Sequence, residues 1–226
     1  MDKKRIAVIL PCYNEQSSVA YVIGEWLSLS PDIHVWFCDN NSTDKSLSEA
    51  RLCADERLHI IQEEKQGKGN AVRAVLETAD ADVYILCDVD RTYPATMSVA
   101  LPVINGECDM CIGRREGYFL QERKPANSIG NRIVPLICRL GTGLEIEDPL
   151  SGLRAFSKRF ADTLELPGGF AMEAAMARHA SRMGFRVRSV PVEYRPRPGD
   201  EPSKISFLKD GVKIVFAFFH TGHHGG

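Results

Sequence analysis

Residues Val83–Asp90 read VYILCDVD, an apolar run that ends in two aspartates. The run lacks strict apolar–polar alternation, as is typical of a parallel strand that is covered on both faces. Comparable runs with polar endings occur at Ile6–Glu15, IAVILPCYNE, and at Ile33–Asp44, IHVWFCDNNSTD. Doubly wound sheets bind ligands at the carboxyl ends of their strands, so these three endings are expected to converge on one edge.

Strand and helix patterns alternate through the first half of the chain. The expected strands are Ile6–Leu10, Ile33–Cys38, Leu58–Gln62, Val83–Cys87 and Met110–Gly113. The expected helices are Ser17–Leu29, Thr43–Ala54 with Ser42 or Thr43 as N-cap, Gly69–Ala79 and Pro94–Ile104 with Pro94 in the first turn. The pattern predicts an α/β fold with a mostly parallel sheet flanked by helices.

The second half is less regular but carries no repeat or clear linker. Helices are expected at Pro125–Leu140, Met172–Met183 and Ser203–Phe219, and a strand at Arg186–Tyr194. A chain of 226 residues, 44% hydrophobic and 26% charged, suits one globular domain, residues 1–226. The sequence contains no run of about 20 apolar residues that would span a membrane, and its start has no signal-peptide pattern.

Cysteine usage indicates reduced, buried thiols. The seven cysteines are scattered, and most lie within apolar runs. The pair Cys108-x-x-Cys111 lacks the second pair of a zinc site and enters a predicted strand, so no metal or redox role is expected for it.

Charge is unevenly distributed along the chain, although the net charge is only −2. Residues 1–113 carry ten Lys and Arg and 18 Asp and Glu, whereas residues 114–226 carry 18 and 12. An acidic half beside a basic half favours a metal site that faces an anionic ligand, although chance drift of surface charge would look the same.

Asp88 and Asp90 are the candidate metal ligands. Alternation along an extended chain points both side chains the same way. Mg²⁺ is commonly bound by one or two carboxylates together with substrate phosphates. Two solvated turn aspartates are the plainer alternative, but the buried strand before them and the other strand-end carboxylates favour a metal.

Three further segments offer contacts for a nucleotide. Pro11, Tyr13 and Glu15 follow the first strand, and Asp39 ends the second, where acidic residues contact ribose or base in nucleotide-binding α/β folds. Lys68 lies in a Gln-Gly-Lys-Gly-Asn loop before a helix, where a cation and backbone N–H groups can approach an anion.

The basic half supplies candidate phosphate ligands, since arginine binds phosphate bidentately and lysine as a point charge. Each alone reads equally well as a solvated surface residue. They are Arg114, Arg115, Arg123, Lys124, Arg132, Arg195, Arg197 and Lys204.

Taken in order, Pro-Cys-Tyr-Asn-Glu, Asp-Asn-Asn-Ser-Thr-Asp, Gly-Lys-Gly-Asn-Ala and Asp-Val-Asp resemble family-2 glycosyltransferases of the GT-A fold. The segments DPLSGLRAF at 148–156, VPVEYR at 190–195 and SKI at 203–205 resemble dolichyl-phosphate mannose synthases and related polyprenyl-phosphate glycosyltransferases. The resemblance extends from about Ile6 to Gly211. It implies a single Rossmann-like GT-A domain, with a nucleotide-sugar and metal half at about 1–113 and an acceptor half at about 114–226.

The resemblance also implies roles for individual residues. The nucleotide is expected at Pro11, Tyr13, Glu15, Asp39, Lys68 and Asp88, and Mg²⁺ or Mn²⁺ at Asp88 and Asp90. The acceptor phosphate is expected at Arg115, Arg123, Asn127 and Lys204. Asp90, Arg115 and Asp148 are expected to act in catalysis. Many relatives have Gln where this chain has Thr92, which leaves one metal or phosphate ligand open.

The implied reaction is inverting transfer of a hexose from GDP-mannose or a UDP-sugar to dolichyl or polyprenyl phosphate. A phosphate monoester is largely dianionic at pH 7 and needs no general base, so Asp148 is expected to orient an arginine or the sugar. A sugar-hydroxyl acceptor would instead require Asp148 as a base. A non-catalytic nucleotide-sugar-binding subunit is the non-enzyme alternative.

A lipid acceptor implies contact with a membrane. Peripheral attachment at its cytoplasmic face is expected, through the Ser203–Phe219 helix or a membrane-anchoring partner subunit, although that helix equally suits a core-covering role. The histidines His220, His223 and His224 are assigned to a tail, and nucleic acid is not expected as a partner.

Overall fold

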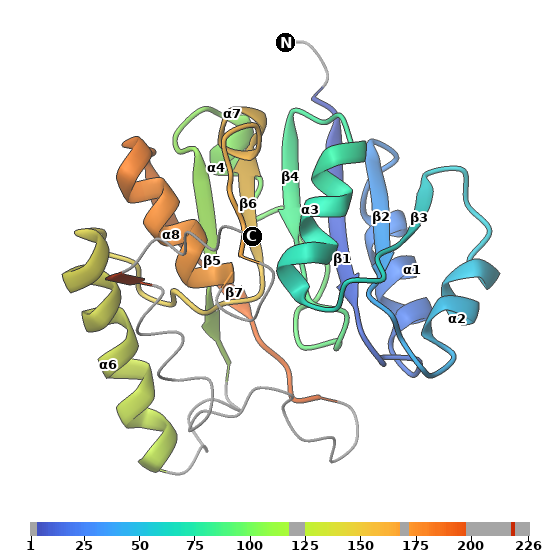
Figure 1. The fold of residues 1–226 in the computed structure, drawn as a ribbon, viewed down its shortest axis with the longest axis horizontal. Coiled ribbons are helices and arrows are strands. Elements are labelled where there is room, and N and C mark those ends of the chain that lie inside the picture. Colours follow the sequence, from blue (N-terminus) through green and yellow to red (C-terminus); the bar gives the residue numbers. More distant parts are fainter. Residues whose placement is uncertain (1–3, 118–124, 168–171, 198–217, 220–226) are drawn as a thin grey trace.

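A seven-stranded mixed sheet with helices on both faces forms the fold (Figure 1). The computed structural model describes residues 4–117, 125–167, 172–197 and 218–219, and within α6 it describes side chains from Ile133 onward. The strand order is β3-β2-β1-β4-β6-β5-β7. Every pairing is parallel except the two made by β6, which runs antiparallel to both β4 and β5. The expected α/β class with a mostly parallel sheet is confirmed.

The strands are short, and the central ones are mostly buried, whereas the edge strands β3 and β7 are mostly half-buried or exposed. Their bounds are β1 Ile6–Cys12, β2 Ile33–Asp39, β3 Leu58–Gln62, β4 Val83–Leu86, β5 Met110–Glu116, β6 Arg154–Ser157 and β7 Val187–Glu193.

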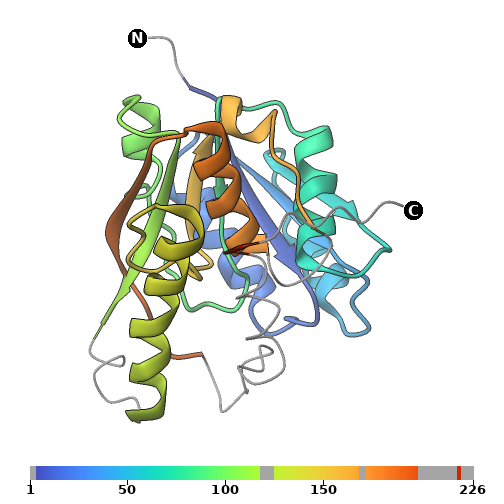
Figure 2. The ribbon, with the colours of Figure 1, turned by 60° about the vertical axis from the view of Figure 1, so that its left-hand side comes forward.

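Two apolar cores lie on the two faces of this sheet. One face is covered by α1 Val19–Leu29, α2 Ser46–Leu52 and α4 Leu101–Ile104. The other is covered by α3 Lys68–Thr78, α6 Pro125–Thr142, α7 Lys158–Ala161 and α8 Met172–Met183. Helices α6 and α8 contact each other and lie side by side in Figure 2. No helix among the described residues is both long enough and apolar enough to cross a bilayer.

All six strands expected from the sequence are present, and β3 and α8 have the expected bounds. Strand β6 was not expected. It has only four residues and begins with an arginine, so it shows no apolar run. Arg154 is nevertheless fully buried.

Two helix starts differ from expectation. The helix expected from Pro94 begins only at Leu101, because the hydroxyl of Thr96 accepts a hydrogen bond from the N–H of Ser98 at 3.2 Å, a local bond that competes with helix formation. Helix α2 starts at Ser46, and neither Ser42 nor Thr43 caps it. Their Oγ and N–H groups instead bond to the backbone N–H and the side chain of Asn14.

The reversal of β6 determines which loops meet at the functional edge. Parallel strands β1, β2 and β4 end there, whereas β6 begins there, with Arg154 paired to Leu86 of β4 and to Ile112 of β5. The backbone N–H of Gly113 bonds the carbonyl of Leu153 at 2.9 Å. The segment just before β6 is therefore brought against the ends of β4 and β5.

Candidate active site

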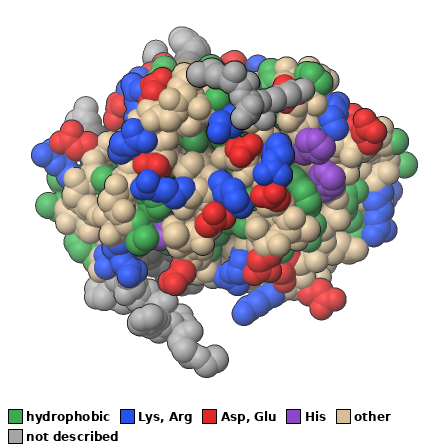
Figure 3. Space-filling view, turned by 90° about the horizontal axis from the view of Figure 1, so that it is seen from above, with side chains coloured by type: hydrophobic (Ala, Val, Ile, Leu, Met, Phe, Trp, Pro, Cys, Tyr) green, Lys and Arg blue, Asp and Glu red, His purple; other side chains and the backbone are tan. Residues whose placement is uncertain are grey.

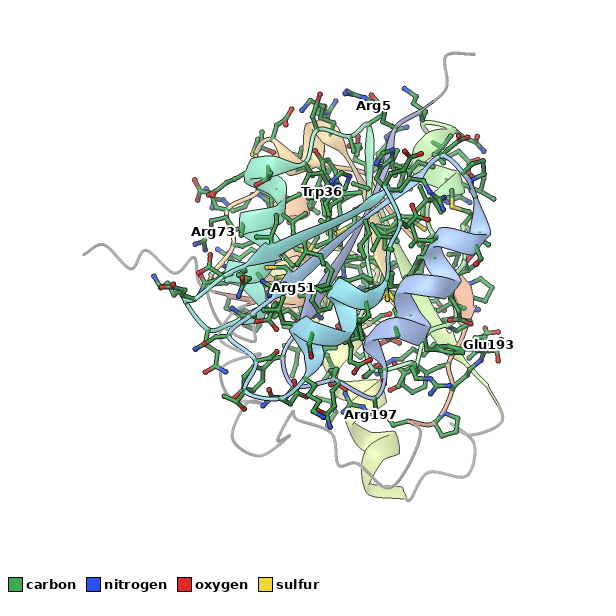
Figure 4. The ribbon with its side chains drawn as sticks, turned by 90° about the vertical axis from the view of Figure 1, so that its right-hand side faces the viewer. Arg5, Trp36, Arg51, Arg73, Glu193 and Arg197 are labelled. Carbon is green, nitrogen blue, oxygen red and sulfur yellow. The ribbon has the colours of Figure 1, made fainter. Side chains whose placement is uncertain are left out.

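The carboxyl edge of the sheet gathers side chains from segments that are far apart in the sequence. Figure 4 shows Arg197 at this end of the molecule, with Arg5 at the other. The opposite end, seen in Figure 3, carries acidic and basic side chains interspersed with one another.

Asp88 follows β4 and is paired with a lysine. Lys68 Nζ, at the start of α3, lies 2.6 Å from Asp88 Oδ1 and 2.7 Å from Glu173 Oε1 in the first turn of α8. Burial opposes ionisation of Asp88, but the charge and hydrogen bond of Lys68 outweigh it, so the pKa of Asp88 lies below its usual value. The carboxylate is thus ionised and ready for a cation.

A glycine makes room for the Asp88 carboxylate. A Cβ atom on Gly152 would lie 1.9 Å from Asp88 Oδ2 and 2.6 Å from its Cγ. The N–H of Gly152 donates to the hydroxyl of Tyr93 at 3.0 Å, and that hydroxyl also lies 3.2 Å from Ser151 Oγ. The segment before β6 therefore forms a cradle around Asp88.

Asp90 is held by a separate set of contacts. Thr92 donates to Asp90 Oδ1 from its hydroxyl at 2.5 Å and from its backbone N–H at 3.1 Å. Arg197 Nη2 lies 2.6 Å from Asp90 Oδ2. Arg197 also lies near enough to Asp88 to lower the pKa of that carboxyl. Thr92, which stands where many relatives have Gln, therefore serves in this chain to hold Asp90 in place.

Arg115 and Asp148 form a two-bond ion pair. Arg115 donates from Nε to Asp148 Oδ2 at 2.6 Å and from Nη2 to Oδ1 at 2.7 Å, and its backbone N–H adds a third bond to Oδ2 at 3.2 Å. Burial lowers the pKa of Arg115, but the bonds to Asp148 raise it well above its ordinary value. Asp148 is consequently engaged by a permanent cation.

Asp39 ends β2 at this edge and has an unsatisfied oxygen. The residue is 3% exposed, and its Oδ1 has no hydrogen-bond partner among the described residues, while Oδ2 accepts only a 3.3 Å bond from the N–H of Ser42. An orphaned buried acceptor is costly unless a ligand supplies a donor. The neighbouring strand β1 ends at Cys12, which pairs with Asp39, and just after it Tyr13 is 39% exposed and Glu15 is buried.

The neighbouring Asn40 fixes the loop that leads to Lys68. Its side-chain amide donates to the carbonyls of Glu63 and Lys65, both at 3.0 Å, and its oxygen accepts from the N–H of Gly67 at 2.6 Å. Gly67 has φ 134°, a conformation that favours glycine. These hydrogen bonds fix the loop that places Lys68 beside Asp88.

The structure thus brings Asp39, Lys68, Asp88, Asp90, Arg115 and Asp148 to one end of the sheet. The sequence patterns did not single out Glu173 or Gly152. Glu173 is one polar residue in an amphipathic helix and gave no signal, whereas Gly152 was visible only as part of the SGLR segment. Arg197 was one of several basic residues, and nothing in the sequence separated it from Arg195.

Several predicted residues lie outside the described part of the chain. They are Arg123, Lys204, the side chain of Asn127, most of the Ser203–Phe219 helix and the three C-terminal histidines.

The residues present fit a divalent cation of the Mg²⁺ or Mn²⁺ type. Asp88 and Asp90 offer hard oxygen donors, and Gly152 leaves the space that the Asp88 carboxylate needs. The described residues contain no group of three or more His, Cys, Asp or Glu side chains able to hold a metal. Mg²⁺ usually takes several of its ligands from substrate phosphates and water, so two protein carboxylates can be enough.

Comparison with known families decides the class. Residues 7–176 match the model of glycosyl transferase family 2. The chain belongs to glycosyl transferase family 2. It is a glycosyltransferase, and this agrees with the resemblance that the sequence motifs carry.

Several curated relatives of this family-2 enzyme come from archaea and mycobacteria. The glycosyltransferase AglJ of Haloferax volcanii is 32% identical over 95% of this chain and 71% of its own length. A dolichyl-phosphate hexose transferase of the same organism is 25% identical over 92% and 90%. A polyprenol monophosphomannose synthase of Mycolicibacterium smegmatis is 24% identical over 86% and 78%.

Solved structures support the fold of this glycosyltransferase. Glucosyl-3-phosphoglycerate synthase from Mycobacterium tuberculosis, in complex with phosphoglyceric acid, aligns with a TM-score of 0.75 at 20% identity, covering 97% of this chain and 82% of that one. The same enzyme in complex with Mn²⁺, UDP-glucose and phosphoglyceric acid gives 0.73 at 20% identity, with 97% and 81% covered.

Replacing Gly152 with alanine tests the cradle around Asp88. The new methyl group forces the carboxylate to rotate away, and a misplacement of about 1 Å can cost about 100-fold in rate. We expect a loss of that order in the rate of sugar transfer with little change in melting temperature, since the clash is with the end of a side chain. Steady-state kinetics and thermal melting measure the two effects.

Gly24→Ala is the matched control, because a Cβ at this α1 position meets nothing within 4 Å. Wild-type rates in the Gly152→Ala enzyme would contradict the assigned geometry.

Proposed function

We propose that this enzyme transfers a hexose, with inversion, from a nucleotide-diphosphate sugar to a dolichyl or polyprenyl phosphate. The observation that carries the proposal is the ion pair between Arg115 and Asp148. Asp148 stands where a general base would be needed for a hydroxyl acceptor, yet both of its oxygens accept from Arg115. A phosphate monoester acceptor needs no such base because it is already largely dianionic at pH 7.

The donor occupies the half of the domain formed by about residues 1–113. The nucleotide lies against Pro11, Tyr13, Glu15 and Asp39, where the unsatisfied Oδ1 of Asp39 suits a ribose hydroxyl or a base N–H. GDP-mannose and UDP-sugars both meet these requirements. The Mn²⁺ and UDP-glucose bound by the glucosyl-3-phosphoglycerate synthase support a donor of this kind.

Asp88 and Asp90 hold Mg²⁺ or Mn²⁺ against the donor diphosphate, with Lys68 beside them. When bound, the cation neutralises negative charge on the departing nucleotide diphosphate. Thr92 and Gly152 keep the two carboxylates in place.

The acceptor occupies the half formed by about residues 114–226, in which Arg115, Arg123, Asn127 and Lys204 receive its phosphate. Asp148 uses the Nε and Nη2 atoms of Arg115, and a planar guanidinium has a second edge that can bind phosphate bidentately. Arg197 adds a further cation at the same edge. The names of two relatives, a dolichyl-phosphate hexose transferase and a polyprenol monophosphomannose synthase, support this acceptor.

Attack by the acceptor oxygen, in line with the departing diphosphate, inverts the anomeric carbon. Holding the two reactants in that geometry can supply about 7–11 kcal/mol of the barrier. The arginine pairs are suited to this task because their positions are fixed before the acceptor arrives.

A partition assay tests the reaction itself. Purified enzyme, Mn²⁺ or Mg²⁺ and a short polyprenyl phosphate are mixed with radiolabelled GDP-mannose, UDP-glucose or UDP-N-acetylglucosamine. We expect metal-dependent label in the organic phase with one donor. Arg115→Met should raise the KM of the lipid phosphate about 10- to 100-fold, since a hydrogen bond to a charged group contributes about 1.5–3 kcal/mol.

Arg114→Met is the control, because Arg114 pairs with Glu116 and Glu147 at the surface. Label that stays aqueous with every donor would overturn the lipid-phosphate acceptor.

Asp148→Asn separates the phosphate acceptor from a sugar-hydroxyl acceptor. With lipid phosphate as acceptor, we expect the KM of the acceptor to rise because Arg115 loses its charged partner. We expect kcat to fall by a smaller factor than it would if a general base had been removed. Loss of a general base typically costs about 100- to 10,000-fold. A kcat loss in that range, measured under saturating acceptor, would favour the hydroxyl mechanism.

An exposed apolar stripe on α6 supports peripheral contact with a membrane. Ile133, Leu136 and Leu140 are 47%, 55% and 69% exposed, at spacings that place them on one side of the helix. The sequence from Arg123 to Leu144 contains four Lys and Arg residues and no Asp or Glu. Apolar residues with basic neighbours suit an anionic lipid surface, such as the cytoplasmic face of a membrane, with or without an anchoring subunit.

Leu136→Glu is expected to weaken binding to anionic vesicles by about tenfold or more, since burying one leucine contributes about 1.5–3 kcal/mol. Co-sedimentation with vesicles measures the binding. Leu52→Glu on α2 is the control, because Leu52 is also an exposed leucine, at 76%, but lies on another helix. Equal vesicle binding by the two variants would contradict a membrane contact through α6.

A further inference from the structure

Glu173 lies at the active-site edge without a place in the reaction described above. It is in the first turn of α8, is buried, and its Oε1 lies 2.7 Å from Lys68 Nζ. The same ammonium group lies 2.6 Å from Asp88 Oδ1. Lys68 is therefore shared between two carboxylates that are 85 positions apart in the sequence.

Glu173 also lies beside a second buried cation. Arg154 is fully buried, and its Nη groups donate to the carbonyls of Ser151 at 2.6 Å, Pro149 at 3.2 Å and Glu173 at 3.4 Å. Burial lowers the pKa of Arg154, and the negative charge of Glu173 opposes that shift.

Glu173 sets the net charge beside Asp88. Asp88, Glu173 and Lys68 together carry one negative charge, because a single lysine is shared by two carboxylates. Without Glu173, the charges of Lys68 and Asp88 cancel, and Asp88 is the one carboxylate among the described residues that pairs with Lys68. Both effects oppose the approach of a divalent cation to Asp88.

We infer that Glu173 is a positioning residue for the metal site: it shares Lys68 with Asp88, and so keeps that carboxylate available to Mg²⁺ or Mn²⁺. The inference rests on the proposed metal site at Asp88 and Asp90. By this inference, a residue of α8 controls how tightly Asp88 and Asp90 bind the cation.

Binding of Mn²⁺ itself, followed by electron paramagnetic resonance of the free ion, tests the inference without turnover. Glu173→Gln keeps an oxygen that can face Lys68 but removes the negative charge. It should weaken Mn²⁺ binding about 10- to 100-fold, which is typical when a residue that supports a metal ligand is replaced. Lys68→Met should tighten binding of the ion, because it frees Asp88. The double variant should return to near the wild-type affinity, because it removes one charge of each sign.

In activity assays, Glu173→Gln should raise the metal concentration for half-maximal rate by a larger factor than it lowers kcat. Glu77→Gln, which removes the same charge from an exposed position on α3, is the matched control and should bind Mn²⁺ as the wild type does. Glu173→Asp, which retains the charge, should recover part of the lost affinity.

The outcomes separate this inference from the proposed function. Wild-type affinity in Glu173→Gln would overturn the inference and leave the metal site standing. A double variant as weak as Glu173→Gln would also overturn it, because a purely structural defect is not repaired by removing Lys68. No Mn²⁺ binding by the wild type, with or without GDP or UDP, would overturn both. If Glu173→Gln fails to fold, unchanged or weaker Mn²⁺ binding in Lys68→Met would still contradict the inference.

Discussion

The direction of β6 is the constraint on which the active-site edge depends. In a purely parallel sheet, only strand ends reach the carboxyl edge, and the segment before a strand starts at the far side. Because β6 runs antiparallel between β4 and β5, the residues that precede it arrive at the same edge as Asp88. Gly152 then lies against the Asp88 carboxylate, and Asp148 reaches Arg115 at the end of β5. One reversed strand of four residues thus brings Asp88, Arg115 and Asp148 to the same edge.

Neutralisation by specific partners is the second principle of the site. Charged groups removed from water are expensive unless each has a counterion and hydrogen bonds. Here Asp88 has Lys68, Asp90 has Arg197 and Thr92, and Asp148 has Arg115. These pairs hold the groups at fixed distances before substrate binds, and fixed dipoles and charges need not reorganise during reaction.

The sequence predicted the parts of the fold that depend on local patterns. Apolar runs located β1 to β5, and amphipathic spacing located α8 at its observed bounds. The polar endings after β1, β2 and β4 were expected to converge, and the parallel register brings them together. Local pattern could not reveal β6, since a four-residue strand that begins with a buried arginine resembles a loop.

Long-range pairs were the other part that the sequence did not reveal. Lys68 and Glu173 are 105 positions apart, and nothing in an amphipathic helix marks which of its polar residues turns inward. Arg197 likewise pairs with Asp90 across 107 positions, whereas Arg195, two residues earlier, lies at the surface beside Glu193. A cluster of basic residues in the sequence identifies several candidate ligands. The packing of the folded chain decides which of them pairs with a buried carboxylate, as Arg197 does with Asp90.

The same pairing supports the proposed phosphate acceptor over a hydroxyl acceptor. An arginine that is locked by a carboxylate on one edge still presents donors and a positive potential on the other, which suits a dianion and offers a neutral hydroxyl no proton acceptor. To activate a hydroxyl, Asp148 would have to release Arg115 and leave a half-buried guanidinium without its counterion, which is a costly state. The energetic cost of separating Arg115 from Asp148 therefore links the geometry at the end of β5 to the chemical class of the acceptor.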